Sequence, residues 1–317
     1  MEHFRNLALG QIPRILGLGD RRSGSPTFGC FDRYHWHYQF LDFPNARFQE
    51  AALLLGLLWR EDFPGNLYFS NARILEWVHA ALQFWLKSRN RDGSVAEAYP
   101  LERSFCATAF SAYAVSECLV LLGGAPPPSL EKTFDWLTRN ENLAVANQMA
   151  VAALALHNCF RLTGHDRYRA AAAEKVEKLL GSRHPTGYFQ EYGGHDIGYS
   201  SLTISCLAQY FLGTHENELW RALQKAGTLL AERVQEDGSY DLGGTSRQTQ
   251  FLYPFGLAVI NSDVVRRLLN GLNANRIIHP GWLDDRYVIQ LTTNYLQTYL
   301  KLYHADDNDQ VDRTASV

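Results

Sequence analysis

The sequence predicts an all-α protein whose helices form an (α/α)6 toroid, a closed ring of six helical hairpins. A turn signal recurs along the chain at intervals of 49, 47, 47, 51 and 43 residues. Its six positions are Pro44, Gly93, Asn140, Gly187, Gly238 and Gly281. Each interval holds two apolar stretches of helical length, and a period of roughly 40–50 residues is the length of one helical hairpin with its loop. Each of the six hairpins must pack its apolar faces against other hairpins, and a closed ring gives every hairpin such neighbours.

Apolar residues spaced three and four positions apart predict the individual helices in order. Their expected ranges are 3–17, 45–61, 70–88, 103–123, 129–139, 142–164, 166–182, 199–214, 216–235, 247–260, 262–274 and 285–304. The helix at 166–182 has a charged face and is expected on the outside of the ring. The stretches 144–160 and 200–211 carry few charges and are expected to line its inside.

Size and composition favour one large domain, residues 1–304, followed by a flexible polar tail at 305–317. No Pro/Ser-rich linker, charge block or low-complexity tract divides the 317 residues. Hydrophobic residues make up 46% of the chain and aromatic residues 13%, so that it can bury a sizeable core.

Net charge indicates which partners to expect, and cysteine content indicates the cellular compartment. A net charge of −3 gives no general attraction to nucleic acid or anionic membranes, so an acidic ligand needs a local cluster of basic groups. The five cysteines are scattered and form no CxxC pair, which favours a reducing compartment. Neither a leader nor an apolar run of membrane-spanning length is visible, and we expect a cytoplasmic protein without membrane insertion.

A basic mouth is expected where the inner helices begin. If these helices start near 45, 103, 142, 199, 247 and 285, their first turns carry four arginines. The four are Arg47, Arg103, Arg247 and Arg286. Helix N-termini already favour negative charge, so the guanidinium groups predict an anion-binding rim. The alternative is that each arginine forms a structural ion pair with a nearby carboxylate.

The segment 187–203 is the richest in groups that can carry chemistry. It contains the carboxylates of Glu191 and Asp196, the imidazole of His195, three tyrosines and four glycines. Glycines let the backbone approach a ligand closely, and His195 and Tyr199 can move protons. Tyr199 needs a nearby positive charge to act as a base near neutral pH, and Arg247 is the nearest candidate in the ring order. The structural alternative is a loop whose tyrosines pack on the rim.

Two adjacent amides, Asn147 and Gln148, interrupt an otherwise apolar inner helix. A buried amide costs free energy unless it is hydrogen-bonded. The two side chains therefore either satisfy the backbone or face the central cavity, and we expect the cavity.

An Asn followed by a polar residue near the start of one inner helix, and a Tyr opening the next 52 residues later, resembles the toroid domain of heparinase II/III-like and alginate-type polysaccharide lyases. The resemblance covers about residues 70–304 and rests on short motifs. It implies that Asn147 neutralises a uronate carboxylate and that Tyr199 acts as acid or base at the leaving oxygen. Gln148 stands where those lyases commonly have a histidine base, which leaves Tyr199, His195 or His37 for that role. Those lyases usually also carry a β-sandwich domain, for which this chain has no room.

The segment before the first inner helix is rich in aromatic and histidine side chains. In an extended conformation His35 and His37 lie on one side, a spacing that allows two metal ligands. No third ligand and no HExxH motif is visible, so we expect neither a metal nor another cofactor. Trp36, with Tyr34 and Tyr38, instead predicts a surface on which the apolar face of a sugar ring stacks.

Polar groups cluster again where the last inner helix begins. Asp284 is expected to cap this helix. The three residues expected to contact substrate there are Asp285, Arg286 and Tyr287.

The leading hypothesis is a carbohydrate-active enzyme that takes a proton from C5 of a uronate in an acidic oligosaccharide or polysaccharide. β-Elimination would then make it a lyase, and reprotonation a C5-epimerase. A toroid glycoside hydrolase would instead use two carboxylates. Its candidates are Asp32, Glu191, Asp196, Asp241 and Asp285. Two further interpretations remain. One is a terpene-cyclase-like toroid, although the sequence has no DxDD motif, and the other is a non-catalytic glycan-binding toroid.

Overall fold

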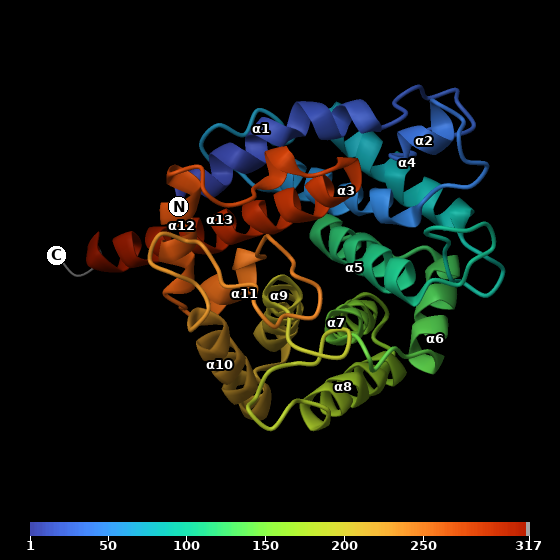
Figure 1. Ribbon diagram of the computed structural model, residues 1–317. Coiled ribbons are helices and arrows are strands. Elements are labelled where there is room, and N and C mark those ends of the chain that lie inside the picture. The colour runs from blue at the N-terminus through green and yellow to red at the C-terminus, as the bar shows by residue number, and fades with distance from the viewer. Residues whose placement is uncertain (315–317) are drawn as a thin grey trace. The chain divides into compact units, whose positions relative to one another are not determined.

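The computed structural model describes the backbone of residues 1–314 and the side chains of residues 1–305 (Figure 1). Within this range the regular structure is helical, with thirteen α-helices, three short 3-10 helices and no β-strand. The α-helices are α1 (Glu2–Leu18), α2 (Arg33–Trp36), α3 (Ala51–Arg60), α4 (Ala72–Ser88), α5 (Phe105–Leu122), α6 (Glu131–Arg139), α7 (Ala146–Thr163), α8 (Asp166–Gly181), α9 (Ile197–Thr214), α10 (Asn217–Ala231), α11 (Pro254–Val259), α12 (Val264–Asn273) and α13 (Asp285–Thr314). The predicted all-α class is confirmed. Helix α13 includes residues 305–314 of the tail expected at 305–317. Residues 315–317 lie outside the described residues.

The chain divides into two compact units. The C-terminal unit consists of Arg183–Val317 together with Met1–Gln11, and the N-terminal unit is Ile12–Ser182. Each unit contains three helices of the predicted inner set. These are α3, α5 and α7 in the N-terminal unit, and α9, α11 and α13 in the C-terminal unit.

Helices α5 and α7 form the centre of the N-terminal unit. Helix α5 packs against α3 and α7, and α7 also packs against α8. Ser104 caps α5 by accepting a hydrogen bond from the amide of Ala107 (3.1 Å). Fourteen of the 18 residues of α7 are buried, against five of the 16 in α8. This difference agrees with the prediction that α7 is an inner helix and that α8 turns a charged face to solvent.

Helix α5 is the one helix of the described residues that has the length and apolar composition to cross a membrane. Of its apolar window, 61% is buried inside the structure, where it contacts α3 and α7. Core helices of soluble proteins share these properties, so α5 is only a weak indication of a membrane span.

Helix α11 packs against both α9 and α13 in the C-terminal unit. It comes closest to α9 at Gly256, where an added Cβ would lie 2.6 Å from the carbonyl group of Ile204 and from the Cα of Ser205. The Ser205 hydroxyl joins the two segments, because it donates to the carbonyl oxygen of Tyr253 and accepts from the amide of Gly256, both at 3.1 Å. Only glycine therefore allows this approach.

Gly256→Ala is expected to lower the free energy of unfolding by about 2 kcal/mol, because the new methyl group meets backbone atoms that cannot rotate away. Urea denaturation measures this change. Gly10→Ala in α1 is the matched control, since no atom lies within 4 Å of a Cβ added there and alanine favours helix. Unchanged stability of Gly256→Ala would contradict the close contact.

One prediction of local structure is wrong, and the extended conformation considered for His35 and His37 is not adopted. The helix expected at 247–260 is limited to α11 and begins at Pro254, a residue that favours the first helical position. Arg247 consequently lies in the preceding loop. The segment around His35 and His37 is not extended but forms the helical turn α2, capped by Asp32. Positions two apart in a helical turn do not face the same way, so the two imidazoles do not share a side.

Candidate functional site

Three tyrosines and two arginines gather in the C-terminal unit where α9 and α13 begin, and we call them the tyrosine–arginine cluster. Its members are Tyr192, Tyr199, Arg247, Arg286 and Tyr287. The ring centres of Tyr192 and Tyr199 lie 5.1 Å apart, and the Arg247 guanidinium lies 4.6 Å from the centre of the Tyr192 ring. Tyr287 lies within hydrogen-bonding reach of Tyr199, and the Arg286 guanidinium lies 4.4 Å from the centre of the Tyr287 ring. The structure thus brings together four residues selected from the sequence and adds Tyr192.

Asp196 joins the two segments that carry Tyr199 and Arg247. One carboxylate oxygen caps α9 by accepting the amide N–H of Tyr199 (2.9 Å), and the other accepts the amides of Arg247 and Thr249 (3.2 Å each). Gly198 leaves room for this loop, because a Cβ there would collide with the Thr249 side chain. One fully buried carboxylate therefore fixes the position of the loop on the helix.

Asp284 orients the start of α13 in a similar way. Its Oδ1 accepts the amides of Arg286 (3.0 Å) and Tyr287 (2.8 Å), so the predicted capping role is confirmed. Asp285, the first residue of α13, is half-buried.

The environment of Tyr199 keeps its phenol protonated. Burial raises the pKa of Tyr199 well above its usual range, and the neighbouring Tyr287 and Tyr192 add to this effect. Arg247 acts in the opposite direction, as expected for the nearest positive charge, but does not outweigh burial. Tyr199 is therefore suited to donate a proton and is not suited to act as the base.

His195, in contrast to Tyr199, is a candidate proton acceptor. Burial lowers the pKa of His195, and the positive charge of Arg233 lowers it further, while Asp196 opposes the shift. The imidazole is consequently neutral near pH 7 and can accept a proton. Its ring meets the Tyr188 ring edge-on, with 5.1 Å between the centres.

The carboxylates of Glu191 and Asp196 both serve the structure. Each residue is fully buried, and Glu191 accepts a hydrogen bond from the hydroxyl of Thr203, while Asp196 accepts three backbone amides. An acid–base pair must reach the bond that it cleaves. Neither carboxylate has that access in this arrangement.

Three side chains selected in the N-terminal unit have partners within that unit, namely Gln148, Arg103 and Arg47. Asn147 and Gln148 are buried, and Gln148 accepts a hydrogen bond from the side-chain amide of Asn142 (2.9 Å). This contact fits the structural alternative for Gln148. The arginines also form ion pairs, Arg103 with Asp92 at 3.1 Å. The second pair is Arg47 with Glu50.

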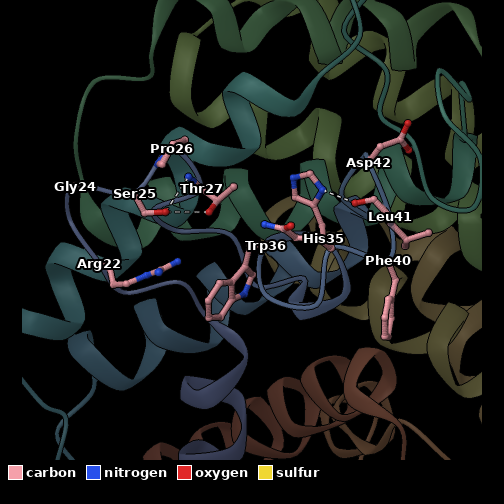
Figure 2. A pocket seen from close by; sticks show the side chains of 11 residues that line it. Arg22, Gly24, Ser25, Pro26, Thr27, His35, Trp36, Phe40, Leu41 and Asp42 are labelled. Carbon is pink, nitrogen blue, oxygen red and sulfur yellow. Dashed lines mark hydrogen bonds between the residues drawn. The ribbon is translucent and has the colours of Figure 1, made fainter.

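A groove of about 950 Å³ opens beside α2 in the N-terminal unit, and we call it the aromatic groove (Figure 2). It is lined by Arg22, Gly24, Ser25, Pro26, Thr27, His35, Trp36, Gln39, Phe40, Leu41 and Asp42. Trp36 belongs to this lining, whereas Tyr38 and His37 lie beside it. Tyr38 stacks on Phe40 with 5.6 Å between ring centres, and the His37 ring lies 5.0 Å from Trp36 and 4.9 Å from Tyr38.

No family model matches the chain, and comparisons with curated proteins and with solved structures also yield no match. Among the described side chains, no group of three or more His, Cys, Asp or Glu residues is placed to hold a metal ion. Function is therefore inferred from the geometry of the cluster and the groove.

Proposed function

We propose that the chain is a carbohydrate-active enzyme that acts on an acidic, uronate-containing glycan as a lyase or C5-epimerase, and that its hairpins close into an (α/α)6 toroid. The tyrosine–arginine cluster is the observation that carries the proposal, because it combines a protonated phenol with two guanidinium groups. Guanidinium groups pair with carboxylates in a bidentate geometry, and positioned phenols transfer protons.

In both reactions a base takes the C5 proton of the uronate, and the electron pair moves into the carboxylate, which becomes enolate-like. Arg247 and Arg286 would stabilise this charge. In a lyase the C4–O bond then breaks and the Tyr199 phenol protonates the leaving oxygen. In an epimerase C5 is reprotonated from the opposite face. His195, which is neutral, is the candidate base in the same unit.

A hydrolase that uses paired carboxylates is a weaker candidate. Asp32, like Glu191 and Asp196, is fully buried. Its two oxygens accept the amides of Tyr34 (3.0 Å) and Asn45 (2.9 Å), so that it too supports the backbone. Three of the five candidate carboxylates are thus committed to holding local structure.

Incubation of the full-length protein with uronate-containing polymers distinguishes the reactions. Elimination forms a conjugated unsaturated product, so ultraviolet absorbance rises. Epimerisation in deuterated water places deuterium at C5 with no such rise. New reducing ends without either signal would identify a hydrolase and overturn the proposal.

Arg247→Gln and Arg286→Gln are each expected to weaken binding of a uronate trisaccharide about tenfold, because each removes a charge-assisted hydrogen bond to the carboxylate. Isothermal titration calorimetry at two salt concentrations measures this effect, and added salt should weaken binding to the wild type. Arg169→Gln is the matched control, since this exposed arginine of α8 pairs with Asp166. An equal loss in the control would assign the effect to net charge rather than to the cluster.

A further inference from the structure

The aromatic groove has the size of a small-molecule site. Its volume of about 950 Å³ lies in the upper part of the range of roughly 300–1,000 Å³ that is typical of ligand pockets. All of its lining comes from one short stretch, residues 22–42. Figure 2 shows Arg22 and Trp36 on one side, Phe40, Leu41 and Asp42 on the other, and His35 between them.

Two aromatic side chains supply apolar surface to the groove. The indole Nε1 of Trp36 donates to the carbonyl oxygen of Leu18 (2.7 Å), so the polar atom of this ring is already satisfied. Phe40 is 75% exposed, although its ring stacks on Tyr38. A large apolar ring that stacking holds in place and that is still mostly exposed is suited to contact the apolar face of a ligand.

Arg22, which lines the groove, forms a bidentate ion pair with Asp20. Its Nε and Nη2 donate to the two oxygens of Asp20 (2.9 and 3.1 Å), and Thr27 Oγ1 also donates to this carboxylate (2.8 Å). Burial alone would raise the pKa of Asp20, but these hydrogen bonds outweigh it and hold the pKa well below the usual range. Asp20 is therefore ionised, and the charge of Arg22 is already balanced. The guanidinium also lies 5.3 Å from the centre of the Trp36 ring.

The remaining polar groups supply both donors and acceptors. His35 Nδ1 lies 3.0 Å from the carbonyl oxygen of Leu41, which can only accept, so Nδ1 is the donor, and Nε2 is an acceptor whenever the ring is neutral. Gln39 offers an amide, and Asp42 offers a carboxylate. These are the groups that hydroxyl-rich ligands need.

The charges of the groove favour a neutral ligand. Arg22 is neutralised by Asp20, and the other acidic lining residue, Asp42, adds a negative charge. An acidic sugar would meet no unbalanced positive charge among the lining residues and would be repelled by Asp42. We infer that the aromatic groove binds a neutral pyranose unit, stacked against Trp36 and Phe40 and hydrogen-bonded through Gln39, His35 and Asp42. This site shares no residue with the tyrosine–arginine cluster and selects a different kind of sugar.

Saturation-transfer NMR on the full-length protein tests this site with the methyl glycosides of glucose, galactose and mannose, and with methyl glucuronide as the acidic counterpart. At least one neutral glycoside should bind more tightly than methyl glucuronide. Phe40→Ala should weaken that binding about 3- to 10-fold, the value of one good aromatic contact. Asp42→Asn should narrow the gap between the neutral and the acidic sugar, because it removes the repelling charge. Leu67→Ala is the matched control, since this side chain is 84% exposed and does not line the groove.

Two results would overturn the inference. The first is the absence of binding by all three neutral glycosides. The second is neutral binding that Phe40→Ala and Asp42→Asn leave unchanged. Thermal unfolding of both variants should match the wild type, since these residues are exposed. Binding of the neutral sugar should also survive Tyr199→Phe, so that failure at the groove and failure of the proposed enzymatic activity are separate outcomes.

Discussion

Tyr199→Phe is expected to lower turnover of the uronate glycan by at least about 10²-fold, the usual contribution of a positioned proton donor. In the proposed reaction, the substitution removes only the hydroxyl that would donate to the leaving group, and it keeps the ring that packs against Tyr192. Binding of the glycan should change little, because Arg247 and Arg286 remain. Steady-state kinetics should therefore show the loss in kcat rather than in KM.

The pH profile gives an independent check on the role of Tyr199. Because burial raises the pKa of Tyr199, the phenol keeps its proton at pH values where a free tyrosine would lose it. A reaction that needs protonated Tyr199 should retain activity above about pH 10, the usual tyrosine pKa. Tyr99→Phe is the control, since this tyrosine is 71% exposed and lies outside the cluster. Full activity in Tyr199→Phe would remove this residue from the mechanism.

The helices could be predicted from sequence because their signals are local. The range 166–182 matches α8, Asp166–Gly181, and 103–123 matches α5, Phe105–Leu122, which begins after the capping residue Ser104. The helix expected at 247–260 failed for a tertiary reason. Asp196, about fifty residues earlier, accepts backbone amides of that segment and holds it as a loop. No local pattern reports such a contact.

Some residues of the candidate site could likewise be identified from local sequence signals, and others could not. Residues at helix starts, such as Tyr199 and Tyr287, could be selected because capping and turn signals fix where those helices begin. Tyr192 could not, since it comes near Tyr199 through a loop in which its own backbone is left-handed (φ 54°). Of the residues that line the aromatic groove, the sequence had pointed only to His35 and Trp36. Arg22 joins it through a buried carboxylate, Asp20, whose burial the sequence does not reveal.

Asp196→Ala is expected to lower the free energy of unfolding by about 4 kcal/mol, because it removes the cap of α9 and leaves three backbone amides without their acceptor. Asp196→Asn should cost about half as much. Asparagine is also a good capping residue, so its oxygen can still accept from Tyr199. Its NH2 group, however, would face the amides of Arg247 and Thr249, where only an acceptor fits.

The asparagine variant therefore separates a structural role of Asp196 from a catalytic one. In a structural role, the loop that carries Arg247 loosens while α9 stays intact, so KM for the uronate glycan rises together with the loss of stability measured by urea denaturation. A catalytic carboxylate predicts the reverse, a collapse of kcat at unchanged stability. A loss of kcat at unchanged stability, together with full activity of Tyr199→Phe, would contradict the proposed proton abstraction. It would indicate a hydrolase that uses carboxylates instead. Because Asp196 is buried and both of its oxygens accept backbone amides, we expect the structural outcome, in which KM rises and stability falls together.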